Sequence, residues 1–399
     1  MAFATIGTKG ITDATIATAD IADNAVTSAK TSGIPARPNA NPLIINGDMV
    51  VAQRATSKAS ISGGGYNTVD RYQNNNAGAF IGTWTQTQES LSSGDAFNDG
   101  FAKSLKMDCT TANASPAANS SNWIQYGIEG QDLQLLKHGT SSAEKLTLSF
   151  WIKATKTGTN VVRLYKTDAD RSCSQAYTVS SSDTWEYKVL NFPADTSGAV
   201  IANDNTLGMG INFAIAMGSN FTSGTLATSW AANTSANDYV GQVNNADSTS
   251  NNWEITGVQL EIGEYTSSTL PPFQHESYAD NLLRCQRYYY FYASEATNGG
   301  TDTSLCVTTQ YNTSQCKGLI SFPCSMRAKP TLSQNTGSNM YRLYSNNANA
   351  TMDSLSLATE GTYNYAIVYN GTSVSVTAGT AGILQTMDST ASVAFDSEI

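Results

Sequence analysis

The sequence predicts an all-β protein made of three parts: an extended N-terminal repeat segment, a large antiparallel β-sandwich and a smaller C-terminal β-sandwich. Charged residues are 14% of the 399 residues, well below the usual quarter, while small polar and aromatic residues are plentiful. This composition is typical of strands joined by many turns. Short runs that alternate apolar and polar residues recur between clusters of Asn, Gly, Ser and Asp, which supports the same fold class.

The N-terminal segment carries an aliphatic residue at every fifth position, namely Ile6, Ile11, Ile16, Ile21 and Val26. On a helix five residues turn about 140°, so these side chains form no stripe. On a strand an odd spacing sends successive residues to opposite faces. Such a repeat is stable only where stacked coils, a host protein or copies of the same chain complete its core. We therefore predict an attachment and oligomerisation segment.

A stiff, extended linker follows the repeat, because three prolines fall within residues 34–42. Residues 1–40 are thus the first predicted unit, and residues 41–283 the large sandwich. Residues 129–138 could add one short helix at its edge. The clearest strand is 145–154, where Leu146, Leu148, Phe150 and Ile152 share one face and Trp151 points to the other. The remaining strand signals of this unit are 79–88, 104–109, 160–167, 184–192, 209–217 and 252–263.

Residues 271–292 break the strand pattern. Two prolines end the last strand, and the spacing of Tyr278, Leu282, Cys285 and Tyr289 predicts a helical connector that runs into a Tyr-rich strand. Strand signals then continue to the end of the chain. Residues 284–399 are therefore predicted to form the second, smaller β-sandwich.

Charge and hydropathy exclude several classes of partner. The net charge of −10 and the pI of about 4.7 argue against a nucleic acid or an anionic membrane surface. No apolar run approaches the length of a membrane span, and the start lacks the pattern of a secretory signal, so we expect neither membrane insertion nor secretion. The six cysteines are scattered and are expected to be buried free thiols, although one pair among Cys306, Cys316 and Cys324 could meet.

Motifs for catalysis are absent from the sequence. The only histidines, His138 and His275, are far apart, and no nucleophile or phosphate-binding motif accompanies them. Asp and Glu are numerous enough to supply a glycosidase pair, but no pattern marks two of them. We expect no enzyme, no cofactor and no metal centre. The oxygen-rich ranges 167–172 and 202–208 could hold a structural Ca²⁺, but plain Asx-turns explain them as well.

Aromatic residues matter if the ligand is a sugar, because their faces stack on the C–H groups of pyranose rings. The candidate glycan-binding residues are Trp151, Trp230, Trp123 and Tyr239. Trp151 points away from the aliphatic face of its strand, and Trp230 lies in a polar, loop-like stretch. The alternative for each of the four is packing in the core or at an edge.

Several motifs occur in an order that resembles a known family. The motifs are "NPLIINGDMVVAQRATS", "EGQDLQLL", "LTLSFWIKATKTGT", "WEITGVQLEIGE", "PPFQHESYADNLLRCQRYYYFY", "FPCSMRAKPT" and the terminal "FDSEI". They resemble the virion structural proteins and tail fibres of marine and other tailed bacteriophages. The central motifs are also similar to the jelly-roll carbohydrate-binding modules attached to many glycoside hydrolases. The N-terminal repeat resembles the repeats that begin trimeric phage fibres.

This resemblance implies a jelly-roll fold for residues 41–283 and a structural, non-enzymatic role. It implies a homotrimeric tail fibre, made in the bacterial cytoplasm and located in the virion. The N-terminus would bind other virion proteins of the tail or capsid, and the sandwiches would recognise a glycan of the host surface. Two alternatives are a capsid-decorating (head) fibre or other virion protein without a receptor role, and a secreted carbohydrate-binding module, which would need the secretory signal that the start of the sequence lacks.

Overall fold

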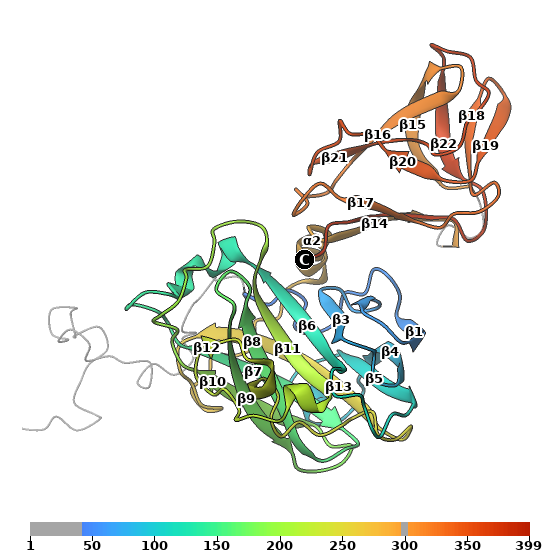
Figure 1. Cartoon of the computed structure of the whole chain (residues 1–399). Coiled ribbons are helices and arrows are strands. Elements are labelled where there is room, and N and C mark those ends of the chain that lie inside the picture. Colours follow the sequence, from blue (N-terminus) through green and yellow to red (C-terminus); the bar gives the residue numbers. More distant parts are fainter. Residues whose placement is uncertain (1–41, 297–301) are drawn as a thin grey trace, which may run out of the picture.

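The computed structural model describes residues 42–296 and 302–399, and the residues of the five-residue repeat lie outside this part of the chain. Strands dominate the described residues and form two β-sandwich domains, of which the larger contains the strands between residues 57 and 262 (Figure 1). The predicted all-β class is thereby confirmed. In the described part of the chain, no helix has the length and apolar character needed to cross a bilayer.

The larger domain packs a six-stranded sheet against a seven-stranded sheet, and neighbouring strands in both sheets pair antiparallel. In spatial order the first sheet contains β1 (Ser57–Ile61), β4 (Thr83–Ser90), β5 (Lys103–Thr111), β13 (Asn252–Ile262), β7 (Leu146–Ala154) and β10 (Glu186–Phe192). The second contains β12 (Ala231–Ala232), β9 (Arg171–Val179), β8 (Gly158–Lys166), β11 (Leu207–Met217), β6 (Ser121–Glu129), β3 (Tyr72–Ala77) and β2 (Gly65–Tyr66). Along the chain, four short helical segments lie in the connections between these strands: α1 (Asp95–Asn98), η3 (Gly130–Leu136), η4 (Ser219–Phe221) and η5 (Ser235–Asn237).

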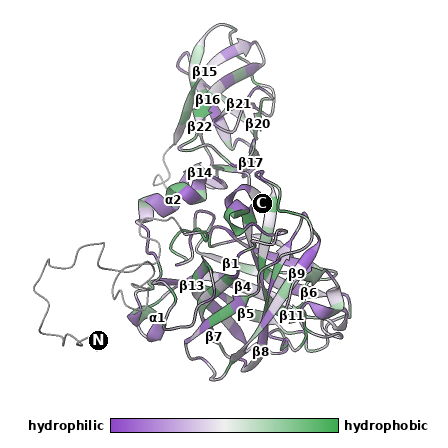
Figure 2. Cartoon of the chain, turned by 90° about the vertical axis from the view of Figure 1, so that its left-hand side faces the viewer, coloured by the Kyte–Doolittle hydropathy of each residue, from purple (hydrophilic) through white to green (hydrophobic). Residues whose placement is uncertain are grey.

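The core of this domain lies between the inner faces of the two sheets, as alternation predicts. Phe150 of β7 is fully buried and meets the ring of Phe213 of β11 edge-on, with centroids 5.3 Å apart. Trp253 of β13 lies 6.1 Å from Phe213. Aromatic pairs in such geometry add to the free energy gained from burial. Figure 2 shows apolar segments along strands of both domains.

Of the seven-stranded sheet, the sequence predicted only β8 and β11, and the longest strands that it missed are β6 and β9. Both β6 and β9 pair with neighbours on two sides, and β9 buries Cys173, Tyr177 and Val179, although Gln175 interrupts the apolar phase of its sequence RSCSQAYTV. The predicted edge helix at 129–138 is the 3₁₀ segment η3. Tertiary pairing, rather than local propensity, decides such polar strands.

The smaller domain begins with α2 (Tyr278–Gln286), where the sequence predicted a helical connector. Ser277 caps this helix, since its hydroxyl accepts the backbone N–H of Asp280 at 3.2 Å. One sheet contains β14 (Tyr289–Ser294), β23 (Ser392–Asp396) and β17 (Thr331–Gln334). The other contains β19 (Ala348–Met352), β18 (Tyr341–Ser345), β22 (Ala381–Thr386), β15 (Ser304–Asn312), β16 (Gln315–Ser321), β21 (Tyr365–Asn370) and β20 (Leu355–Leu357). Their shared core includes Tyr341 and Phe395.

The opening segment ties the larger domain together and reaches the smaller one. The Asn46 side chain donates to the carbonyl oxygens of Val51 and Asp70 at 2.9 and 3.0 Å. Asp48 accepts from the amide of Asn281 in α2 at 3.1 Å. The "INGD" residues of the family resemblance therefore hold a joint, and no ligand is needed to explain them. The predicted boundary at residue 284 falls within α2, beside this joint.

Candidate functional site

A hollow opens on the outer face of the six-stranded sheet, beside Trp151. It has a volume of about 530 Å³ and is called the Trp151 hollow. Its floor comes from the strand register, which sets Trp151 of β7 between Tyr187 of β10 and Thr256 of β13. Its lining residues are Asp99, Phe101, Trp151, Tyr187, Gly257, Gln259, Ser267, Leu270, Pro271, Pro272, Phe273 and His275. Trp151 is half-buried and faces outward, as the sequence predicted.

Two neighbours hold the indole of Trp151 in place. Its N–H donates to a carboxylate oxygen of Asp99 at 3.2 Å. The ring of Tyr187 lies 5.2 Å from it, tilted by 42°. Burial raises the pKa of Tyr187, so its hydroxyl stays neutral and can both donate and accept. The two rings therefore form a continuous aromatic surface with polar atoms at its rim.

A β-bulge shapes the inner end of the Trp151 hollow. Between Thr256 and Gln259 the register of β13 gains one residue relative to β7, and Gly257 there has a φ of 63°. A Cβ at Gly257 would lie 2.7 Å from the ring of Phe101, so glycine allows both the turn and the close approach. The bulge turns Gln259 toward the far wall, where its amide donates to the carbonyl oxygen of Pro271 at 3.0 Å.

The far wall is an aromatic group supplied by the chain after β13. Phe273 meets Phe101 edge-on at 4.9 Å, and the imidazole of His275 lies 4.8 Å from Phe273 and 5.1 Å from Phe101. His275 thus packs among rings, as expected for a structural histidine. His138 lies elsewhere, 5.4 Å from the ring of Trp230.

A second groove, of about 480 Å³, continues from the hollow along β10. The two share Tyr187 and Ser267, and the groove also reaches Asn191 and Tyr265. Lys188 in its lining is paired with Glu186 at 2.6 Å. The combined surface is therefore long, aromatic and nearly neutral, which suits an uncharged chain of sugar rings better than a phosphate or a metal.

Trp230 and Tyr239 lie outside this surface, and both side chains are buried. Trp230 is 9% exposed, and its N–H donates to the carbonyl oxygen of Pro193 at 2.8 Å. Tyr239 is 1% exposed, under the guanidinium of Arg163 at 5.2 Å. Neither ring has a face open to a ligand. The polar loop around Trp230 folds onto the end of the sandwich, which its composition did not reveal.

Trp123 lies on the opposite outer face of the domain, in β6. It is half-buried, and its N–H points to the amide oxygen of Gln125 at 3.3 Å. It also packs against the apolar cluster that contains Val161 and Tyr239. It remains a candidate for a separate platform. Tyr187, Gln259 and the 267–275 wall were missing from the sequence candidates, although Tyr187 has the outward phase of a predicted strand.

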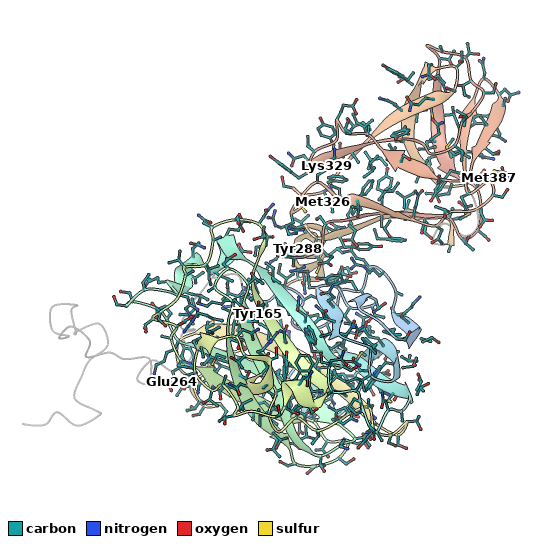
Figure 3. All side chains as sticks on the ribbon, in the orientation of Figure 1. Tyr165, Glu264, Tyr288, Met326, Lys329 and Met387 are labelled. Atoms are coloured by element: carbon teal, nitrogen blue, oxygen red, sulfur yellow. The ribbon has the colours of Figure 1, made fainter. Side chains whose placement is uncertain are left out.

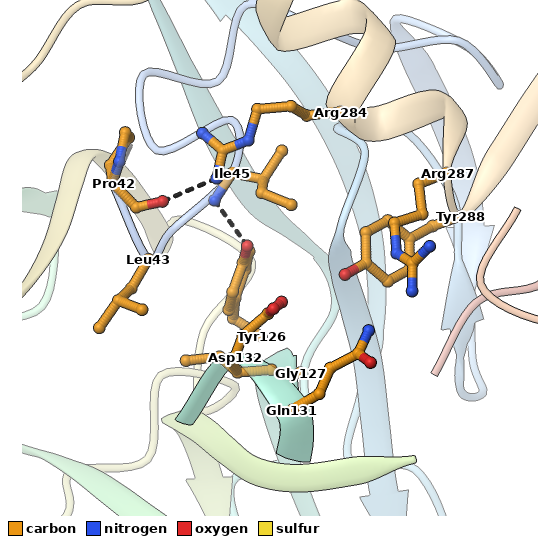
Figure 4. A pocket seen from close by; sticks show the side chains of 11 residues that line it. Pro42, Leu43, Ile45, Tyr126, Gly127, Gln131, Asp132, Arg284, Arg287 and Tyr288 are labelled. Atoms are coloured by element: carbon orange, nitrogen blue, oxygen red, sulfur yellow. Dashed lines mark hydrogen bonds between the residues drawn. The ribbon is translucent and has the colours of Figure 1, made fainter. Parts of the chain in front are cut away.

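A further hollow of about 400 Å³ lies where the linker enters the domain (Figure 4). The two arginines that line this hollow already have hydrogen-bond partners. Arg284 donates to the carbonyl oxygen of Pro42 at 2.7 Å, and Arg287 donates twice to the carboxylate of Glu129 at 2.7 Å. The backbone N–H of Ile45 donates to the hydroxyl of Tyr126 at 2.6 Å. These contacts indicate a joint between segments.

The carboxylates of the two oxygen-rich loops, residues 167–172 and 202–208, accept hydrogen bonds from the backbone. Asp204 accepts the backbone N–H of Thr206 at 2.9 Å, as in an Asx-turn, and Asp168 accepts that of Ala202 at 2.9 Å, which links the two loops. Within residues 42–296 and 302–399, no group of three or more His, Cys, Asp or Glu side chains could hold a metal ion. All six cysteines are free thiols, so the pair left open among Cys306, Cys316 and Cys324 is unbridged.

No protein-family model matches the chain. No curated protein matches it either. Among solved structures, the chain is similar to the enzymatically active domain of tailspike protein 4 of bacteriophage CBA120, with 14% identity, a TM-score of 0.25, and coverage of 48% of this chain and 19% of that one.

Two structures with carbohydrate-binding modules also match. The CBM22-1–GH10 modules of Clostridium thermocellum xylanase 10B show 8% identity, a TM-score of 0.24, and coverage of 49% of this chain and 26% of that one. The CBM22 tandem domain of Paenibacillus barcinonensis Xyn10C shows 10% identity, a TM-score of 0.24, and coverage of 92% and 100%. The matched part thus spans about a fifth of the tailspike chain and a quarter of the xylanase chain. Similarity this distant assigns no activity to the present chain, whose described residues form β-sandwich domains.

Proposed function

We propose that this chain is a non-enzymatic structural protein of a phage virion, a tail fibre whose larger sandwich recognises a glycan of the host surface. The observation that carries the glycan role is the Trp151 hollow, with the Trp151–Tyr187 surface at its floor. Pyranose C–H groups would lie on the two rings. Asp99 and Ser267, both exposed, would bond the sugar hydroxyls.

The strength of such a site follows from its chemistry. Hydroxyls exchange water hydrogen bonds for similar ones, so the net affinity per site is small, on the order of millimolar to micromolar. Several linked copies that engage together raise the apparent affinity by roughly 10²–10⁴. A homotrimer fixed to the particle by its N-terminal segment would supply such copies. The five-residue repeat and the following proline-rich linker support this arrangement.

The test is binding of the purified full chain to polysaccharides from the surface of candidate host bacteria, displayed as an array. Trp151→Ala should weaken binding by about tenfold, since a stacked ring contributes on the order of 1 kcal/mol, while the melting temperature stays nearly constant. The matched control is Tyr278→Ala, which removes an aromatic ring that is 59% exposed on α2. Trp123→Ala decides whether the opposite face takes part.

Two outcomes would contradict the proposal. One is an array without signal for the intact multimer. The other is equal loss of binding in the Trp151 and Tyr278 variants. Antibody labelling of phage particles locates the chain: signal on the capsid would favour the head-fibre alternative, and absence from particles would reject a virion role.

A further inference from the structure

A row of apolar side chains crosses the outer face of the seven-stranded sheet in the smaller domain. Tyr344 of β18 stands opposite Ile383 of β22, which stands opposite Val307 of β15. On the next strand Leu319 of β16 follows Val307, because Thr308 pairs with Gly318. Leu319 in turn faces Ile367 of β21. These five residues, from five adjacent strands, are called the apolar row.

The row is open to solvent in the single chain. Val307 is 70% exposed, Leu319 53%, Tyr344 41% and Ile383 39%. Tyr311, further along β15, adds a ring that is 67% exposed. The outer face of an antiparallel sheet that meets water normally carries polar side chains at these positions. Apolar residues scattered singly need no explanation, but a contiguous strip of this kind marks an interaction surface.

The charged side chains on the same sheet face indicate which kind of partner surface could pack against the apolar row. Along the described strands β15, β16, β18, β21 and β22, the cations on this face are Lys317 and Arg342, and both have partners. Lys317 lies 3.8 Å from Glu360 and 4.7 Å from the ring of Tyr311. Arg342 is paired with Asp302. Along these described strands, both cations on the face are therefore paired. A partner that packs against the apolar row would need an apolar, uncharged surface.

We infer that another copy of this chain covers the apolar row. A copy presents the same uncharged strip, and permanent homo-oligomer interfaces are the most apolar class. Five strands about 4.8 Å apart give the row a length of roughly 20 Å, and Tyr311 extends the exposed apolar surface along β15. This inference rests on the proposed homo-oligomer, but it assigns the contact to residues far from the N-terminal repeat.

The experiment measures protection of a single thiol in the full chain. L319C places a thiol within the row, and V200C is the matched control, at an apolar residue that is 60% exposed in the larger domain. Labelling of the wild type by maleimide is subtracted for the native thiols. At concentrations where light scattering shows an oligomer, the L319C thiol should react about tenfold more slowly than the V200C thiol, and dilution should remove the difference, as mass action requires.

A second variant tests the same face by charge. Val307→Glu combined with Leu319→Glu should weaken self-association by about tenfold or more, because like charges then meet in the interface. Equal labelling of L319C and V200C at every concentration would overturn the inference, even if the chain is an oligomer through its N-terminal segment. A monomeric wild-type chain, or protection only inside assembled particles, would also overturn it and assign the face to another protein.

Discussion

Arg71 of the larger domain forms an ion pair with Glu398, which follows the last strand of the smaller domain. The Arg71 side chain is fully buried, and it also donates to the carbonyl oxygen of Gly127 at 2.7 Å. Its guanidinium lies 3.4 Å from the ring centre of Tyr288, which marks the junction in Figure 3. The two domains are therefore joined through a buried charge that each of them helps to satisfy.

Glu398→Gln should destabilise the whole chain. Removing the carboxylate leaves the Arg71 cation buried without its counter-charge, which costs about 3–5 kcal/mol. Thermal unfolding, followed by calorimetry, measures the loss. The matched control is Glu264→Gln, which breaks an exposed pair with Lys145 and should change the free energy of unfolding by about 0–1 kcal/mol. Equal effects of the two substitutions would show that the junction does not depend on this pair.

His138 should make stability fall on acidification. Burial and the nearby Lys166 ammonium lower its pKa to about 4, so the folded chain holds it neutral. The unfolded chain takes up a proton near its usual pKa of about 6.5. Stability from this group is present above pH 6.5 and is lost as the pH falls toward 4, by about 3 kcal/mol in total.

His138→Gln isolates this contribution, because the amide can still donate to the carbonyl oxygen of Glu144, which lies 3.1 Å from the imidazole. Denaturant unfolding between pH 7 and pH 4 is compared for the two proteins. Asp70 acts in the opposite direction. Burial raises its pKa to about 6, so its contribution to the free energy of unfolding becomes more favourable to the folded state as the pH falls. The difference between variant and wild type is therefore the quantity to follow. A constant difference across this range would contradict the expected role of His138.

Gly257→Ala should destabilise the β-bulge at the inner end of the Trp151 hollow and change the shape of the hollow. Its positive φ strains any other residue by about 1–3 kcal/mol, and the new methyl group would displace Phe101 from the wall. We expect a lower melting temperature together with weaker glycan binding. Gly63→Ala is the control, since a Cβ there meets no atom within 4 Å. If both variants melt alike, the bulge does not need glycine.

Deletion of residues 1–41 should leave cooperative folding intact. The two large cores include residues from Ile44 to Ile262 and from Leu305 to Phe395, all beyond the deleted segment. The truncated chain should therefore melt in one sharp transition within a few degrees of the full chain, yet fail to enter phage particles. A broad transition, or normal incorporation, would show that the predicted boundary or the attachment role is wrong.

The alternation of apolar and polar residues predicted some of the strands but not others. The strand β7 was evident because Leu148, Phe150 and Ile152 face the core, whereas in β9 the polar Gln175 interrupts the inward-facing phase that Cys173 and Tyr177 share. For the site, the outward phase of Trp151 could be predicted from its own strand. Its partnership with Tyr187 depends on the register between β7 and β10, which no local pattern specifies. Trp230 is buried because the loop around it packs inward, which its polar composition does not indicate.

The hydrogen bond between Trp151 and Asp99 has a consequence for selectivity. Because the indole N–H is already engaged, the ring orientation is set before any ligand arrives, and little side-chain entropy is lost on binding, where ordering such a side chain costs about 0.5–1.5 kcal/mol. A ligand then meets the flat face of the ring rather than its polar edge. Discrimination would depend on the stereochemistry of the sugar, since only epimers with several C–H bonds directed to one side can lie flat on a fixed indole.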